Sequence, residues 1–104
     1  MKLVWNDDAK FSMREVARYI NRKFGKKSRK EFMQRLHDVE HYIKTNPDSP
    51  KIDPLSEGRK RVYRSVLINN LSKLVYYVEG DEINIAAFWD GRTDAEEQAR
   101  RIKE

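Results

Sequence analysis

The stretch between Arg59 and Arg92 constrains the fold most, because it holds three apolar runs separated by two short polar turns. The runs are rich in β-branched and aromatic residues, and the turns fall at residues 68–70 and 79–81. Runs of this kind joined by short turns are typical of an antiparallel three-strand meander. We therefore predict a sheet here and expect the preceding chain to pack against it.

Two helices are predicted before the sheet. After a short strand over residues 2–6, Asn6 and the acids Asp7 and Asp8 suit a helix start. A single apolar face then recurs at helical spacing until Gly25, and it comprises Met13, Val16, Ala17, Ile20 and Phe24. Ser28, with Glu31 three residues later, is expected to cap a second helix, whose apolar face is Phe32, Leu36, Val39 and Ile43.

The second helix is expected to end at Asn46-Pro47, and a loop over residues 48–58 should be tethered by Ile52 and Leu55. A weakly apolar helix is predicted from Thr93 to Glu104. The fold class is thus α+β, with the order β-α-α-β-β-β and a C-terminal helix. We expect one domain over residues 1–104, with the helical hairpin packed on an antiparallel sheet.

Composition and charge limit the classes of function that the chain can have. The chain has no cysteine, which excludes disulfides and thiolate metal sites, and no apolar run has the length of a membrane span, so a cytoplasmic protein is expected. The net charge of +5 comes from the first 60 residues, which carry 15 Lys/Arg and nine Asp/Glu. This excess suits a polyanion or an acidic partner, and the candidate RNA-binding cations are Lys26, Lys27, Arg29 and Lys30. The other interpretation is a solvated turn between helices.

Residues 37–41 match the H-x-x-E-H zinc pattern, with His37 and His41 four residues apart. The apolar stripe through Leu36, Val39 and Ile43 places both histidines toward solvent, and a catalytic zinc needs a third ligand in a walled cavity. We therefore expect neither a metal site nor a cofactor.

Several cationic side chains lie along the predicted sheet. Strand alternation puts Arg61 and Tyr63 on one face of the first run and Arg64 on the other, and Lys73 shares a face with Tyr77. Both faces are mixed, so periodicity leaves open which face the helices cover. Cations beside tyrosines on an uncovered face would hold phosphates and stack bases, whereas cations on an edge strand would guard against aggregation.

The chain resembles the RelE/ParE superfamily of type II toxin–antitoxin toxins over nearly its whole length. The resemblance rests on the order and spacing of residues 4–9, Tyr19-Ile20, Asn46-Pro47, Tyr63-Arg64, residues 73–78 and residues 88–92. It implies a toxin neutralised by a cognate antitoxin. RelE-like members cleave mRNA on the ribosome, whereas ParE-like members poison DNA gyrase without catalysis.

Carried over by position, the resemblance implies a catalytic set of Arg64, Lys73 and Arg92, with Arg61 and Tyr63 binding RNA. Gln98 stands where such toxins often carry a tyrosine, and no Tyr or His follows Tyr77, so the proton-transfer pair is incomplete. We predict a toxin with ribosome-dependent mRNA cleavage. The alternatives are a gyrase inhibitor and an inactive relative that binds an antitoxin.

Overall fold

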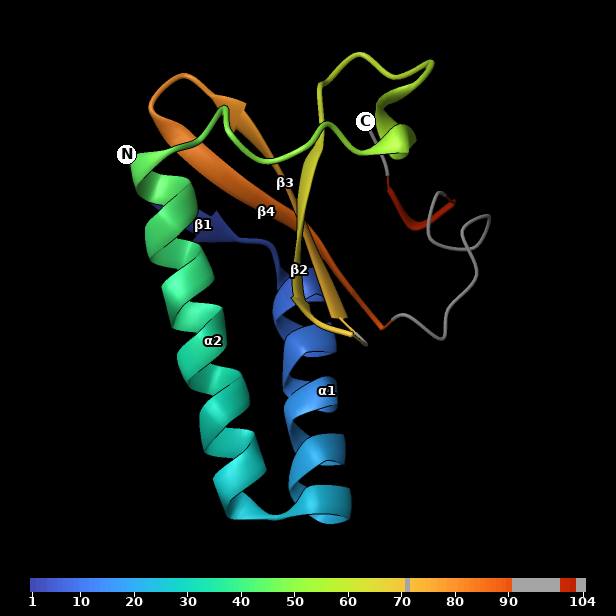
Figure 1. Ribbon diagram of the computed structural model, residues 1–104. Coiled ribbons are helices and arrows are strands. Elements are labelled where there is room, and N and C mark those ends of the chain that lie inside the picture. Colours follow the sequence, from blue (N-terminus) through green and yellow to red (C-terminus); the bar gives the residue numbers. More distant parts are fainter. Residues whose placement is uncertain (71, 91–99, 103–104) are drawn as a thin grey trace.

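The computed structural model describes residues 1–70, 72–90 and 100–102 (Figure 1). Its elements follow the predicted order and confirm the α+β class. They are β1 (Lys2–Trp5), α1 (Asp7–Phe24), α2 (Lys26–Thr45), the short 3-10 helix η1 (Pro54–Ser56), β2 (Arg64–Asn69), β3 (Ser72–Glu79) and β4 (Glu82–Asp90). Of the predicted C-terminal helix, residues 93–99 and 103–104 lie outside the described residues, and Arg100 and Arg101 are helical.

The four strands form one sheet in the order β1-β4-β3-β2. β2, β3 and β4 are antiparallel neighbours, as the meander predicts. The sheet as a whole is not antiparallel as expected, because β1 lies parallel to β4 with Leu3 opposite Ile83. Two helices and two strands separate β1 from β4 in the chain, and a long crossover of this kind is what parallel pairing requires. The sheet is therefore mixed.

The helix boundaries follow from local chemistry. The Asn6 side chain accepts a hydrogen bond of 2.7 Å from the Ala9 amide, which confirms the predicted cap of α1. Gly25 ends α1 with a φ of +95°, a conformation that favours glycine. The predicted Ser28 cap is wrong. Because Gly25 reverses the chain within one residue, α2 starts at Lys26, and the Ser28 hydroxyl donates back to the Phe24 carbonyl instead.

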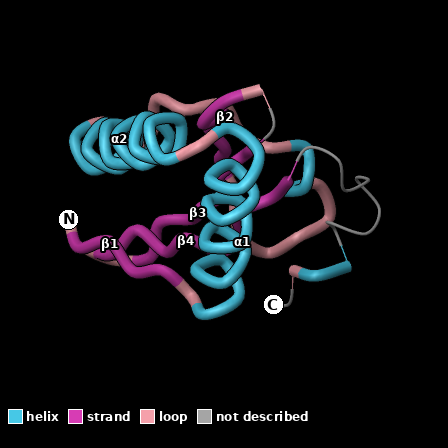
Figure 2. The backbone as a smooth tube through the Cα atoms, turned by 90° about the horizontal axis from the view of Figure 1, so that it is seen from below, coloured by secondary structure: helices cyan, strands magenta, loops and turns pink. Residues whose placement is uncertain are grey.

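The helices cover one face of the sheet (Figures 1 and 2). The main core joins the buried faces of α1 and α2 to strand residues Ile68, Leu74, Tyr76, Ile85 and Phe88. The apolar faces predicted for both helices contribute to this core, with one exception. Phe24 is 58% exposed, because it lies in the last turn of α1, beyond the edge of the sheet.

A second, smaller core lies on the other face of the sheet, where Tyr63, Val75, Ala87, Trp89 and Ile102 are buried together. The register of β3 against β4 shifts between Val75 and Tyr76. Alternation along β3 then puts Leu74 and Tyr76 under the helices and Lys73, Val75 and Tyr77 on the opposite face. This settles which face the helices leave uncovered. No helix in the described part of the chain is long and apolar enough to cross a membrane.

Candidate functional site: a cation and carboxylate pair beside an aromatic groove

Lys73 forms the centre of the candidate site, on the sheet face away from the helices. Its Nζ lies 2.8 Å from Oδ2 of Asp53 and 5.2 Å from the centroid of the Trp89 ring. The Lys73 side chain is 29% exposed, whereas that of Asp53 is 4% exposed. The pair therefore consists of a buried carboxylate and a cation that still reaches solvent.

The loop before β2 positions Asp53. The Asp53 Oδ1 accepts a hydrogen bond of 2.9 Å from the Leu55 amide and so caps η1, and the Asp53 amide donates to the Tyr63 carbonyl at 2.8 Å. Leu55 packs against the second core as predicted. Ile52 is 51% exposed, and it tethers the loop through its backbone, in an isolated bridge with Arg64, rather than through its side chain. A polar residue, Asp53, also anchors this loop, because its carboxylate bonds to Lys73 and its amide bonds to the Tyr63 carbonyl.

The environment of Asp53 decides its charge. Burial alone would raise the pKa of this carboxyl group. Hydrogen bonds from the Lys73 ammonium, the Leu55 amide and the Ser65 hydroxyl outweigh burial and hold the pKa of Asp53 below its ordinary value. The Asp53 carboxylate is thus ionised at neutral pH, because these three partners stabilise its charged form.

Arg61 lies on the same sheet face as Lys73. Its guanidinium stacks 4.3 Å from the centroid of Tyr77 and lies 3.5 Å from Glu79 Oε2, and a hydrogen bond with Tyr63 is the main reason that the pKa of Arg61 is raised. Tyr63 is 1% exposed and packs edge-on against Tyr77, with ring centroids 5.7 Å apart. Its ring therefore has no face open for stacking on a base, while its partner Tyr77 remains half-buried.

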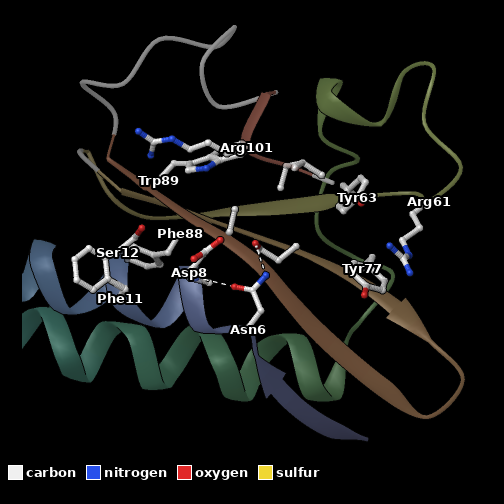
Figure 3. Close-up of a pocket in the computed structure, with 14 residues that line it drawn as sticks. Asn6, Asp8, Phe11, Ser12, Arg61, Tyr63, Tyr77, Phe88, Trp89 and Arg101 are labelled. Atoms are coloured by element: carbon white, nitrogen blue, oxygen red, sulfur yellow. Dashed lines mark hydrogen bonds between the residues drawn. The ribbon is translucent and has the colours of Figure 1, made fainter. Parts of the chain in front are cut away.

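A groove of about 650 Å³ runs across β4 on this face (Figure 3). Arg61 and Tyr77 lie toward one end, and Trp89 and Arg101 toward the other. Phe11 of α1 also lines the groove, and Asn6 holds the nearby strand through a hydrogen bond of 2.9 Å to the Ala86 carbonyl. The floor is thus aromatic and apolar, with a cation toward each end, and Trp89 connects the groove to Lys73.

Arg64 lies apart from this arrangement. It pairs with Tyr76 in the sheet register, and its side chain donates a hydrogen bond of 2.7 Å to the Pro50 carbonyl. Since Tyr76 faces the helices, Arg64 is on the opposite face from Lys73, in a depression of about 500 Å³ at the β2 edge. Arg92 lies outside the described residues. The structure thus does not bring the predicted catalytic cations Arg64 and Lys73 together.

The predicted cations of the helical hairpin are also distant from the groove. Lys26, Lys27, Arg29 and Lys30 are all exposed, and Figure 1 shows the α1–α2 connection at the end of the hairpin that points away from the sheet. A ligand bound at Lys73 therefore does not touch these residues unless it is long.

The two histidines of α2 are exposed, as expected. His37 Nδ1 lies 3.1 Å from Glu40 Oε1, and the other oxygen of Glu40 accepts a hydrogen bond of 3.1 Å from the Trp5 indole. In residues 1–70, 72–90 and 100–102, no cluster of three or more His, Asp or Glu side chains could hold a metal ion. Glu40 acts instead as a link between α2 and β1.

No family model and no curated protein matches the sequence. Solved structures do match it. A YoeB dimer from Staphylococcus aureus is similar to this chain with 21% identity and a TM-score of 0.59, over 86% of this chain and 94% of that one. A YoeB/ParE toxin from Agrobacterium tumefaciens has 20% identity and a TM-score of 0.60, over 86% and 98%. The chain has the fold of the YoeB/ParE toxins. A chromosomal ParDE toxin–antitoxin system from P. aeruginosa, with 14% identity, a TM-score of 0.60 and coverage of 86% and 95%, has it too.

This toxin fold is the one that the resemblance to the RelE/ParE superfamily implied. The sequence predicts Lys73 as a site residue, but it does not predict Asp53, whose carboxylate pairs with the Lys73 ammonium. Asp53 precedes Pro54, and an Asp before a proline-led turn is a recognisable cap signal. Nothing in the sequence links this cap to Lys73, because the two residues lie 20 positions apart.

Proposed function

We propose that this chain is the toxin of a type II toxin–antitoxin pair and that it cleaves mRNA on the ribosome. The observation that carries this proposal is the buried Asp53 carboxylate beside Lys73, next to an open groove with aromatic walls. The fold shared with YoeB/ParE toxins supports the toxin role, and a cognate antitoxin is the partner that this role requires.

The proposed reaction is attack of a ribose 2′-hydroxyl on the adjacent phosphodiester. The 2′-oxygen forms a bond to phosphorus, the bond from phosphorus to the 5′-oxygen breaks, and the products are a 2′,3′-cyclic phosphate and a 5′-hydroxyl. Lys73 would neutralise the charge that grows on the oxygens of the reacting phosphate. Arg61, toward the other end of the groove, would bind a neighbouring phosphate of the same strand. Asp53 would accept the proton of the 2′-hydroxyl, and the Lys73 ammonium would protonate the leaving 5′-oxygen.

Substrate binding would turn Asp53 into a better base. In the free protein its pKa is depressed by Lys73, against the effect of burial. A phosphate that draws the ammonium toward itself would remove this hydrogen bond. The pKa of Asp53 would then rise relative to the free protein, because only the bonds from Leu55 and Ser65 would still oppose the effect of burial. Asp53 would thereby supply the proton acceptor that no Tyr or His after Tyr77 provides. Arg64, bonded to Pro50 on the other face, would support the loop rather than contact the reacting phosphate.

Inhibition of DNA gyrase is the second candidate. It is favoured by the equal likeness to a ParE-type structure, with a TM-score of 0.60, and by the separation of Arg64 from Lys73 on two faces. In this case the Asp53–Lys73 pair would serve only to hold the loop against the sheet. If the chain is instead a catalytically inactive relative that only binds its antitoxin, the Asp53–Lys73 pair would have this same structural role.

Cleavage of a defined mRNA on programmed ribosomes tests the proposal. Wild type should cut within the ribosomal A site, and Asp53→Asn and Lys73→Ala should each reduce the rate by about 100-fold or more. Lys44→Ala, an exposed α2 change outside the groove, is the matched control and should cut at the wild-type rate. Absence of cleavage by wild type would reject the nuclease, and accumulation of gyrase-trapped DNA breaks would establish the alternative.

A further inference from the structure

The end of the helical hairpin carries a concentrated positive charge. We call residues 22–30 the hairpin tip; its cations are Arg22, Lys23, Lys26, Lys27, Arg29 and Lys30. All six are exposed, and no acidic residue occurs between Glu15 and Glu31. None of the ion pairs found in the described part of the chain involves the six side chains.

Helix electrostatics do not explain this cluster. Arg22 and Lys23 lie in the last turn of α1, where cations complement the helix dipole. Lys26 and Lys27 lie in the first turn of α2, which has no acidic residue and no side-chain cap. Cations at that end oppose the dipole, and they also repel one another. The charge of the tip therefore works against the stability of α2, which favours a role in binding a polyanion.

An aromatic ring lies within this cluster. Phe24 is 58% exposed, and Lys23 Nζ lies 5.7 Å from its ring centroid. The same ammonium donates a hydrogen bond of 3.1 Å to the Tyr19 hydroxyl, so Lys23 is held beside the ring. An exposed ring with one ammonium beside it, within a segment rich in cations, matches the two needs of an unpaired nucleotide strand, which are a stacking surface for a base and positive charge for the phosphates.

We propose that the hairpin tip binds single-stranded or looped RNA through its phosphates, with Phe24 stacked on one base. This inference rests on the proposed role in RNA cleavage and adds a second RNA contact to it. Since the tip points away from the sheet, it would hold structured RNA of the ribosome while the aromatic groove beside Lys73 receives the strand to be cut (Figure 1). Binding at the tip and chemistry at the groove are then separable functions.

An acidic protein segment and an anionic membrane are the competing ligands. An acidic peptide would bind through the charge of the tip alone, because its carboxylates offer no π-face to stack on Phe24. A membrane needs a wide apolar face at the interface, and a single ring offers little such area. The combination of one ring with six cations fits RNA best.

The test measures fluorescence anisotropy with a labelled 2′-O-methyl oligoribonucleotide, which lacks the nucleophilic hydroxyl and so reports binding without cleavage. The tip variant replaces Lys26, Lys27, Arg29 and Lys30 by Gln. If these residues neutralise four phosphates, the slope of log K against log salt should fall by about 3. Phe24→Ser, which changes no charge, should weaken binding by about tenfold.

The matched control replaces four exposed cations outside the tip by Gln, at Lys10, Arg14, Arg35 and Lys44. It removes the same formal charge and should change the salt slope by less than about 1. An equal decrease of the salt slope in the control and in the tip variant would overturn the proposal, since binding would then depend on net charge and not on the position of the cations. Wild-type affinity in Phe24→Ser would overturn the stacking contact.

Two competitors identify the ligand. Polyglutamate should displace the oligoribonucleotide poorly, and displacement at an equal concentration of charge would reject RNA in favour of acidic protein. Binding of vesicles with anionic phosphatidylglycerol that the tip variant loses would likewise reject it in favour of a membrane. If wild type binds through the tip but never cleaves, the proposed nuclease activity fails and RNA binding at the tip stands. If wild type cleaves but the tip variant binds RNA as wild type does, RNA binding at the tip fails and the nuclease activity stands.

Discussion

The two faces of the sheet are stabilised in different ways. The face under the helices is held by apolar side chains on continuous helical stripes, which bury Leu36 and Ile43 almost completely. The other face is covered by the loop around Asp53 and by Ile102, and polar contacts hold this cover in place. Among these contacts the Ser56 hydroxyl bonds to the amide and carbonyl of Tyr63, and Arg59 donates to the Ile102 carbonyl at 3.1 Å. One face thus provides stability, and the other provides a reachable cation and a groove.

Truncation of the main core should have the largest effect on folding. Leu36→Ala should lower the free energy of unfolding by about 2–5 kcal/mol, because it opens a cavity under fully buried neighbours. Leu55→Ala, in the half-buried cover of the other face, should cost about 1 kcal/mol or less. Urea unfolding followed by circular dichroism measures both, and equal losses would contradict the contrast between the two faces.

The Asp53–Lys73 pair should be asymmetric. Lys73→Ala leaves a buried carboxylate without its cation and should cost about 1–3 kcal/mol. Asp53→Ala should cost less through this pair, since the released ammonium is part-exposed and turns to solvent, and Asp53→Asn retains most of the cap on Leu55. A double-mutant cycle by urea unfolding measures the coupling. A larger loss in Asp53→Ala than in Lys73→Ala would show that the cap, not the ion pair, holds the loop.

The two faces should also set opposite pH limits of stability. The folded pKa of Asp53 is below its ordinary value of 3.8, so its contribution is complete above about pH 4 and is lost as the pH falls through the folded pKa. Burial raises the pKa of Tyr76 to about 12, so its contribution is complete below about pH 10 and is lost as the pH rises through 12. Thermal melts across pH should show the acid loss vanish in Asp53→Asn and the alkaline loss vanish in Tyr76→Phe. An unchanged profile in either variant would assign that limit to other groups.

The smallest effects concern the helix caps, and they separate a real cap from the predicted one. Asn6→Ala removes the bond to the Ala9 amide together with the bond to the Ala86 carbonyl, and it should cost about 1–2 kcal/mol. Ser28→Ala should change stability by less than about 0.5 kcal/mol, because Ser28 lies inside the first turn of α2 and caps nothing. Thermal unfolding of the two variants under the same conditions checks this, and a cost for Ser28→Ala as large as for Asn6→Ala would restore the predicted cap.

The sequence by itself determined the elements and their order. Helical spacing of Phe32, Leu36 and Ile43 predicts α2 and its buried face, and Gly25 predicts the break between the helices, because these signals are local and depend on backbone geometry within a few residues. The toxin fold was implied by the resemblance to the RelE/ParE superfamily, which rests on short motifs in the same order along the chain.

Tertiary structure alone decided which side chains meet. Alternation showed that Arg64 and Tyr63 lie on opposite faces, but the face that the helices cover depends on how the meander docks onto them. Asp53 reaches Lys73 only because a segment of the loop runs beside β2, with Ile52 opposite Arg64. Such contacts arise from packing between distant segments, and neither periodicity nor spacing contains them. The site therefore became visible only in three dimensions, as one buried carboxylate that holds one cation at the edge of a groove.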